Sequence, residues 1–203
     1  MENLIIYLLA YLIGAIPFGL LLAQIFAKTN IKNAGSKSIG ATNVLRVVKE
    51  SDPKLAKTLA VATIILDALK GIIPILVAKF LAYDENILWT MAVLAVFGHC
   101  FSPYLKFEGG KGVATGAGVL AVFLPFEIMS AILAWFVIGK VFKISSLASL
   151  GALVVLIITS FVFHYDMPAI NTHAPIFIIA FIVVYKHIPN ILRLIGKQEC
   201  KVI

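Results

Sequence analysis

The chain has 203 residues, of which 61% are hydrophobic and 13% are charged. Soluble domains carry about 25% charged residues, so a soluble globular protein is excluded because these few charges cannot cover a water-exposed surface. The net charge of +7 could suggest nucleic-acid binding, but the basic residues flank apolar segments instead of forming one stripe. We therefore expect an all-α integral membrane protein without a nucleic-acid partner.

Apolar segments long enough to enter a bilayer follow one another along the chain. They lie at residues 4–27, 56–82, 87–105, 113–139, 144–163 and 174–186. A hydrocarbon core about 30 Å thick needs about 20 apolar residues per helix. The first segment is too long for the core of a signal peptide, and no small-residue cleavage site follows it, so we expect it to be retained. Without a repeat or a soluble second part, we expect a single membrane domain over residues 1–203.

The basic residues indicate which connections face the cytosol. Lysine and arginine gather in residues 28–57, in residues 106–111 and in the tail after residue 185. Residues 83–86 and 164–173 contain neither. The positive-inside rule therefore places the first three connections in the cytosol and the last two outside.

Single crossings by all the apolar segments cannot satisfy this assignment, because an even number must follow the loop at 106–111. Pro125 interrupts the segment 113–139, and a proline inside a helix removes a hydrogen bond. Division there gives spans 113–124 and 126–139. The expected architecture has seven transmembrane helices, with the N-terminus outside and the C-terminus cytoplasmic. One long tilted helix is the alternative, and it would put the basic tail outside.

Polar residues within or beside the apolar segments predict little chemistry. Asp67 and Lys70 are three residues apart in the second segment, and we interpret them as a structural ion pair, with a polar interior as the alternative. Cys100 and Cys200 have no metal-ligand or disulfide spacing, so we expect free thiols and no metal. Residues expected near the outer surface and given no role are Glu127, His164, Asp166 and His173.

The first cytosolic connection carries a motif suited to phosphate. Residues 33–46 read NAGSKSIGATNVLR, which places glycines, neutral donors and an arginine close together. Glycine lets backbone N–H groups approach an anion, and a guanidinium can bind phosphate with two parallel hydrogen bonds. We predict phosphate binding, against the alternative of a flexible loop with topogenic lysines. The residues predicted to bind are Ser36, Ser38, Thr42, Asn43 and Arg46.

The second motif, residues 98–115, reads GHCFSPYLKFEGGKGVAT and runs directly into an apolar segment. The N-terminus of a helix offers unpaired N–H donors and partial positive charge, and Lys111 adds a full charge beside it. The spacing differs from that of a nucleotide-binding P-loop. We predict an anion site formed by Gly109, Gly110, Lys111 and Gly112. A turn that needs glycine for its geometry is the alternative.

The third motif, residues 185–199, reads YKHIPNILRLIGKQE. His187, Asn190 and Arg193 follow one another at intervals of three, so a helix would place them on one face. Histidine can exchange protons near neutral pH. We predict that the three side chains belong to the site, with a structural histidine as the alternative.

Together, the three motifs resemble those of the bacterial acyl-phosphate:glycerol-3-phosphate 1-acyltransferase family, of the PlsY type. The resemblance covers essentially the whole chain. It depends most on Gly-Ala-Thr-Asn at 40–43 combined with Gly-Gly-Lys-Gly-Val-Ala-Thr at 109–115. The chain departs from the family pattern at Lys37 and Ser38, which replace a Gly-Asn pair, and at Glu108, where lysine is common.

The resemblance implies transfer of a fatty acyl group from acyl phosphate to the 1-hydroxyl of glycerol 3-phosphate. The products are lysophosphatidic acid and phosphate, in the first acylation of phospholipid synthesis. An acyl phosphate is already activated, so no covalent acyl-enzyme, metal or cofactor is expected. We expect a monomer in the bacterial cytoplasmic (inner) membrane, in contact with membrane lipid and with its active site on the cytosolic side. Alternatives are a membrane transporter of an organic phosphate and a non-catalytic assembly factor.

The resemblance also implies roles for individual residues. Glycerol 3-phosphate is held by Ser36, Asn43, Arg46, His187, Asn190 and Arg193. The Gly109–Gly112 backbone and Lys111 hold a phosphate and offset developing negative charge, although the allocation of the two phosphates stays open. The catalytic set is Arg46, Lys111, His187 and Asn190. The hydroxyl proton passes either to His187 or, as we favour, to a substrate phosphate.

Overall fold

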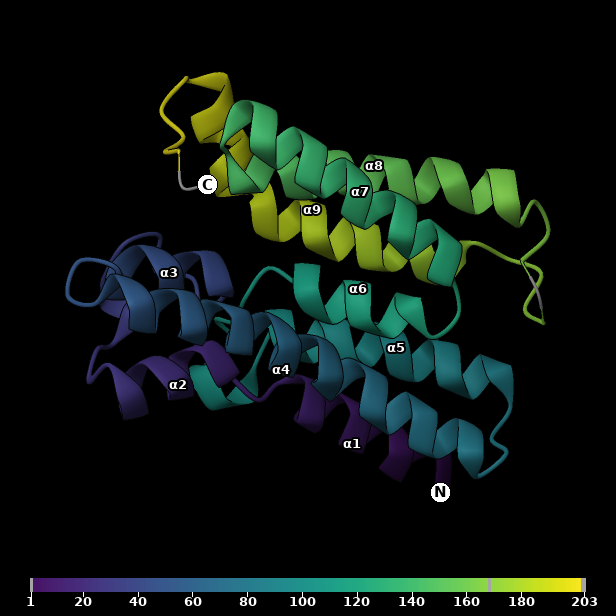
Figure 1. Ribbon diagram of the computed structural model, residues 1–203. Coiled ribbons are helices and arrows are strands. Elements are labelled where there is room, and N and C mark those ends of the chain that lie inside the picture. Colours follow the sequence, from purple (N-terminus) through teal and green to yellow (C-terminus); the bar gives the residue numbers. More distant parts are fainter. Residues whose placement is uncertain (1, 168, 202–203) are drawn as a thin grey trace.

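The computed structural model describes residues 2–167 and 169–201, and this part of the chain is helical with irregular connections (Figure 1). The expected all-α class is confirmed. The elements in chain order are α1 (Glu2–Gly14), α2 (Phe18–Phe26), η1 (Ile31–Asn33), α3 (Ala41–Val48), α4 (Pro53–Phe80), α5 (Glu85–Cys100), η2 (Pro103–Leu105), α6 (Val113–Ala121), α7 (Pro125–Phe142), α8 (Ser145–Phe163) and α9 (Ala174–Ile195).

Among the described residues, 6 helical segments are long and apolar enough to cross a bilayer. They are Asn3–Phe26, Pro53–Phe80, Glu85–Leu105, Pro125–Phe142, Ser145–Phe163 and Ala174–Ile195. Large apolar side chains such as Leu133 and Phe181 are exposed on the outer faces of these helices, as expected for an integral membrane protein. Helix α6 has 9 residues and covers only about 14 Å. The count of seven crossings, which includes α6, therefore stays a prediction.

Two of the apolar segments are interrupted by proline. The predicted division of 113–139 is confirmed, since α6 ends before Pro125, which is the first residue of α7. The first apolar segment, 4–27, forms a candidate span over Asn3–Phe26, but it is not one continuous helix. Residues 15–17 separate α1 from α2, because Pro17 has no N–H to continue the helical hydrogen bonds.

Side chains from distant segments satisfy the backbone at the α1–α2 break. The Ala15 carbonyl accepts a hydrogen bond from Ser102 Oγ at 2.8 Å. The Ile16 carbonyl accepts one from Lys70 Nζ, also at 2.8 Å. A carbonyl without a partner is costly at membrane depth, so these two contacts stabilise the break.

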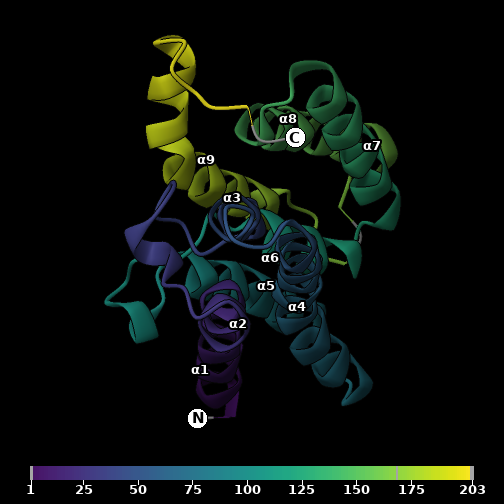
Figure 2. The ribbon, with the colours of Figure 1, turned by 60° about the vertical axis from the view of Figure 1, so that its left-hand side comes forward.

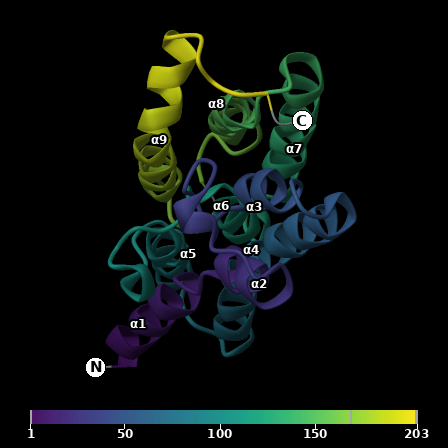
Figure 3. The same cartoon turned by 90° about the vertical axis from the view of Figure 1, so that its left-hand side faces the viewer.

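Helix α6 lies between two groups of helices. Helices α1, α2, α4 and α5 lie on one side of it and α7, α8 and α9 on the other (Figures 2 and 3). Gly118 allows α6 to approach α4 closely, because a Cβ there would lie 2.5 Å from the Ala68 carbonyl oxygen. The buried apolar core around α5, α6 and α9 includes Val96, Val119 and Ile179.

The three motif segments meet at one end of the bundle. The α2–α3 connection with α3, the loop before α6, and the C-terminal tail all lie toward the left-hand end in Figure 1. The N-terminus lies toward the other end, as do the connections that contain no lysine or arginine. Helix α9 continues through Pro189, and its last turns bend away from the rest of the helix (Figure 2). This bend carries the third motif to the same end.

Candidate active site

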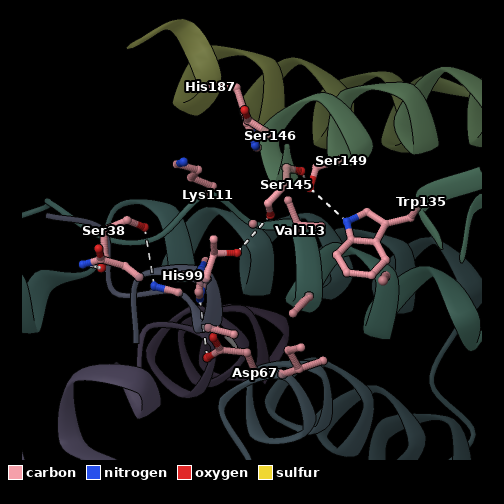
Figure 4. Close-up of a pocket in the computed structure, with 18 of the residues that line it drawn as sticks. Ser38, Asp67, His99, Lys111, Val113, Trp135, Ser145, Ser146, Ser149 and His187 are labelled. Atoms are coloured by element: carbon pink, nitrogen blue, oxygen red, sulfur yellow. Dashed lines mark hydrogen bonds and ion pairs between the residues drawn. The ribbon is translucent and has the colours of Figure 1, made fainter. Parts of the chain in front are cut away.

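One cavity, with a volume of about 520 Å³, brings the three motifs together (Figure 4). Residues of all three motifs line it, together with residues of α4, α7 and α8. The predicted site residues in its lining are Ser36, Ser38, Thr42, Asn43, Arg46, Lys111, Gly112, His187 and Asn190. The predicted residues Gly109, Gly110 and Arg193 are not in the lining.

The cavity changes character along its length. Near the motifs its wall is polar and basic, with Arg46 and Lys111. Farther from that end the wall is apolar, because α4, α6 and α7 contribute small or branched aliphatic side chains. These residues are Ile64, Ala68, Ile72, Ala117, Gly118, Ala121, Ile128 and Ile132. The cavity thus joins a phosphate-suited mouth to an apolar groove between helices.

The Asn43 side chain makes hydrogen bonds to the backbone of the first-motif loop. The side chain is 1% exposed, and its amide donates to the carbonyls of Ile31 at 2.9 Å and Ser38 at 2.8 Å. Its amide oxygen accepts from the Ser36 backbone N–H at 2.8 Å. Both amide hydrogens are therefore engaged by the protein. Asn43 thereby holds Ser36 and Ser38 at the cavity, and its predicted direct contact with substrate stays a prediction.

Helix α3 presents Thr42 and Arg46 one turn apart on the cavity side. Thr42 Oγ1 lies 3.0 Å from Ser145 Oγ, which joins the first motif to the start of α8. Within the described part of the chain, no ion pair involves Arg46. Its guanidinium is therefore available to an anion in the cavity.

The second motif folds back onto the end of α5. The Gly109 N–H donates to the Cys100 carbonyl at 3.1 Å, and the Gly110 N–H donates to the His99 carbonyl at 2.9 Å. These two predicted anion donors are thus already paired. The first hydrogen bond within α6 is donated by the Gly116 N–H. The backbone N–H groups of Lys111, Gly112 and the first turn of α6 are therefore available to an anion.

Lys111 is half-buried among other cations. Burial lowers the pKa of its ammonium to about 8, the carboxylate of Glu199 opposes the shift, and the guanidinium groups of Arg193 and Arg46 add to it. A bound phosphate would relieve this repulsion. The electrostatics of the cavity mouth therefore favour an anion.

The tautomer of His187 follows from its backbone contact. Its Nδ1 lies 2.7 Å from the Val183 carbonyl oxygen, which can only accept, so Nδ1 carries a proton. In the neutral ring Nε2 is then an acceptor. Since the 2%-exposed ring lines the cavity, His187 can bind a hydroxyl or take up a proton there.

Glu199 accepts hydrogen bonds from two other residues of the third motif and from α8. Its carboxylate accepts from Asn190 and Arg193 at 2.5 Å each and from Ser146 at 2.8 Å. Burial acts to raise the pKa of Glu199, but these hydrogen bonds outweigh it and lower the pKa below its ordinary value. Arg193 is therefore directed to Glu199, while Asn190 both contacts Glu199 and lines the cavity.

Several lining residues were not predicted from the sequence. They are Asp67, His99, Trp135, Ser145, Ser146, Ser149, Glu199 and Cys200. Three serines in the first turns of an otherwise apolar helix were a usable signal, because hydroxyl groups there can bind a ligand or cap the helix. Glu199 belongs to the third motif, but no role was predicted for it.

Two buried ionic contacts lie in the membrane-embedded part. The predicted Asp67–Lys70 pair is confirmed, with Lys70 Nζ 2.7 Å from Asp67 Oδ1. Glu127, for which no role was predicted, pairs with His164 at the opposite end of the bundle. The thiols of Cys100, which is buried, and Cys200, which is exposed, are free as expected.

Comparison with known proteins identifies the family of this chain. The family described as glycerol-3-phosphate acyltransferase matches residues 4–197. The glycerol-3-phosphate acyltransferase of Campylobacter lari is 91% identical over 203 residues, which are 100% of both chains. That of a Nitratiruptor species is 58% identical over 200 residues, covering 98% of this chain and 96% of the relative.

Two crystal structures of PlsY, described as an integral membrane glycerol 3-phosphate acyltransferase, share the fold. The glycerol 3-phosphate form has a TM-score of 0.86 at 32% identity and covers 99% of this chain and 96% of that one. The lysophosphatidic acid form has a TM-score of 0.82 at 32% identity, with coverage of 99% and 95%. The chain therefore belongs to the glycerol-3-phosphate acyltransferase family.

Proposed function

We propose that this protein transfers a fatty acyl group from acyl phosphate to the 1-hydroxyl of glycerol 3-phosphate. The products are lysophosphatidic acid and phosphate, as in the first acylation of phospholipid synthesis. The observation that carries the proposal is the cavity, whose basic mouth continues into an apolar groove along α4, α6 and α7. One substrate is a small phosphate ester and the other a phosphate with a long acyl tail, so both fit this division.

Catalysis in this cavity consists of orientation and charge stabilisation. The 1-hydroxyl oxygen attacks the carbonyl carbon of the acyl phosphate, and the bond from that carbon to the phosphate oxygen breaks. Arg46, Lys111 and the N–H groups at the start of α6 offset the charge on the departing phosphate. Ser36, Ser38, Thr42, His187 and Asn190 hold the substrates. Because the mixed anhydride is already activated, no acyl-enzyme is needed.

Asn43 and Arg193 contribute through other groups in this proposal. Asn43 holds the first-motif loop, and Arg193 fixes Glu199, which in turn orients Asn190. Gly109 and Gly110 anchor the second-motif loop to α5. Lys111 lines the same cavity as the first-motif donors and the start of α6, so it can contact either phosphate. The substrate whose KM rises in Lys111→Ala identifies the phosphate that Lys111 holds.

The hydroxyl proton passes to a substrate phosphate in this proposal. A phosphate dianion surrounded by donors at the mouth is positioned as a base. His187 then binds the hydroxyl and need not ionise. His187→Ala should raise KM for glycerol 3-phosphate while leaving the pH profile of kcat unchanged in steady-state assays. Loss of the acidic limb of that profile would assign the proton to His187 Nε2.

The assay that tests the activity uses purified protein in detergent with palmitoyl phosphate and radiolabelled glycerol 3-phosphate. Lysophosphatidic acid should form without coenzyme A, and the Lys111→Ala protein serves as the control for a contaminating enzyme. Uptake of glycerol 3-phosphate into proteoliposomes without chemical conversion would instead identify a transporter. Neither product nor uptake would favour an assembly factor.

We further propose that residues 1–203 form one monomeric acyltransferase domain in the bacterial inner membrane. It crosses seven times, α6 included, with the N-terminus outside and the active site cytosolic. The gathering of the three motifs at one end and the position of the N-terminus toward the other support this topology (Figure 1). In a Cys200→Ser background, Lys37→Cys and Lys197→Cys should be labelled from the cytosolic side and Asn171→Cys from the other. Labelling of the first two from opposite sides would refute the shared site.

A further inference from the structure

A buried cluster of three polar side chains lies beneath the cavity. Asp67, Lys70 and His99 are 3%, 4% and 3% exposed. Lys70 Nζ lies 2.8 Å from His99 Nδ1, within hydrogen-bond geometry. It also lies 2.7 Å from Asp67 Oδ1, and this second contact is an ion pair without hydrogen-bond geometry. Asp67 and His99 also line the cavity, opposite His187 (Figure 4). An ion pair that only neutralised two charges within α4 would require neither His99 nor contact with the cavity.

Lys70 determines the tautomer of His99. An ammonium group can only donate, so His99 Nδ1 must accept and carries no proton. The ring proton is therefore on Nε2, the nitrogen nearest Gly110. The other aligned hydrogen bond of Lys70 goes to the Ile16 carbonyl, which fixes the ammonium between α4, α5 and the α1–α2 break.

His99 in turn supports the second-motif loop. A Cβ added at Gly110 would overlap the Nε2 edge of the His99 ring, so the loop rests directly on that edge. The Gly110 N–H donates to the His99 carbonyl, and the Gly109 N–H donates to the Cys100 carbonyl. Lys111 follows immediately. A rotation of the His99 ring would therefore displace the segment that carries the available anion donors.

We propose that Asp67 and Lys70 position the His99 ring, and that His99 thereby holds the second-motif loop in its phosphate-binding geometry. The three are positioning residues, since none is placed against the reacting atoms. The inference rests on the proposed function for its role in catalysis, but it concerns phosphate binding and can be measured without turnover. Misplacement by about 1 Å can reduce a rate about 10²-fold, so a shifted loop should be measurable.

The test removes the ammonium without leaving a lone buried carboxylate. The double variant Asp67→Asn, Lys70→Met is purified in detergent, and inorganic phosphate is titrated while the melting temperature is followed. The apparent dissociation constant for phosphate should rise by at least about 10-fold relative to the wild type. Lys79→Met, the same substitution at an exposed position of the same helix, should bind phosphate as the wild type does.

A second pair of variants keeps the test decisive if the double variant does not fold. His99→Leu should weaken phosphate binding by at least about 10-fold, and His99→Gln, which can place an N–H donor near the Nε2 position, should recover part of it. In steady-state assays, the His99 variants should raise KM for the same substrate as Lys111→Ala does. Folded variants with wild-type phosphate affinity and only a lower melting temperature would overturn the inference. If the wild type forms no lysophosphatidic acid while the variants still bind phosphate more weakly than it does, the proposed function is refuted and this inference stands.

Discussion

Two polar clusters in the described part of the chain, each with an acidic residue and a histidine, resemble each other locally and differ in what they touch. Asp67 and Lys70 of α4 meet His99 of α5, while Glu127 of α7 meets His164 at the end of α8. In both, a histidine contacts a charged or acidic residue of a neighbouring helix. Asp67 and His99 line the cavity, whereas neither Glu127 nor His164 is in its lining.

The position of each cluster along the bundle accounts for the difference. The first cluster lies directly beneath the loop that carries Lys111. The second lies at the opposite end, where Glu127 is 0% exposed and its Oε2 has no hydrogen-bond partner among the described residues. In the sequence, each cluster is visible only as charged residues within or beside an apolar segment. Proximity to the phosphate donors therefore decides whether such a charge can serve the reaction.

The largest effect is expected at the cavity mouth. Lys111→Ala should lower activity by roughly 10²-fold or more, because it removes a charged donor at the position where negative charge develops. Steady-state kinetics with both substrates would measure this loss. Lys106→Ala, an exposed lysine in the same connection, is the matched control and should be near normal. Near-normal activity of the Lys111 variant would contradict the assignment of the site.

The next largest effect is expected where the loop rests on His99. Gly110→Ala should reduce activity by about 10- to 10²-fold, since the added methyl overlaps the His99 ring and must displace the loop. Gly116→Ala is the control, because a Cβ there meets Ile179 at an ordinary 3.6 Å. Equal activities of the two variants would mean that the loop tolerates displacement and that His99 does not position it.

A smaller effect is expected when pH is raised, and it distinguishes the role of the Lys111 charge from the role of its position. With its pKa lowered to about 8, the free protein loses the ammonium as pH rises above that value. Since phosphate binding requires the charged form, kcat/KM should fall by up to about tenfold per pH unit above pH 8. Lys111→Arg stays charged, so its profile should lack this alkaline limb even if its rate is lower. An identical limb in the variant would assign the titration to another group.

The smallest effect on activity is expected at the second cluster. Glu127→Gln should lower stability by about 1–3 kcal/mol, because it weakens the hydrogen bond between the buried Glu127 carboxyl group and His164. Activity per folded molecule should stay within about twofold of the wild type. Melting temperatures and initial rates measured on the same preparation would separate the two quantities. A larger loss of activity would remove the contrast between the clusters.

Much of the fold could be predicted because lipid imposes simple constraints. Long apolar segments had to be helices, and Pro125 divided the segment 113–139 as expected. The break at Pro17 was missed because hydropathy is continuous across it. The groups that make it tolerable, Lys70 and Ser102, lie far away in the sequence and come into contact only through packing.

The candidate site could be predicted in its composition but not in its internal pairing. Residues from all three motifs were expected at one pocket, and they do line one cavity. The sequence could not reveal that Asn43 would use its amide within the loop, or that Gly109 and Gly110 would donate to α5. Ser145 was missed because its proximity to Thr42 depends on how α8 packs against α3.

The interrupted first span has a consequence for biogenesis. As the nascent chain leaves the ribosome, α1 and α2 enter the membrane before the segments that contain Lys70 and Ser102 have been made. Until those segments arrive, two carbonyls at the break have no partner in hydrocarbon, where each costs several kcal/mol. The broken first span therefore reaches its final shape only after α5 and the turn behind it are inserted, although it is the first part of the chain to be made.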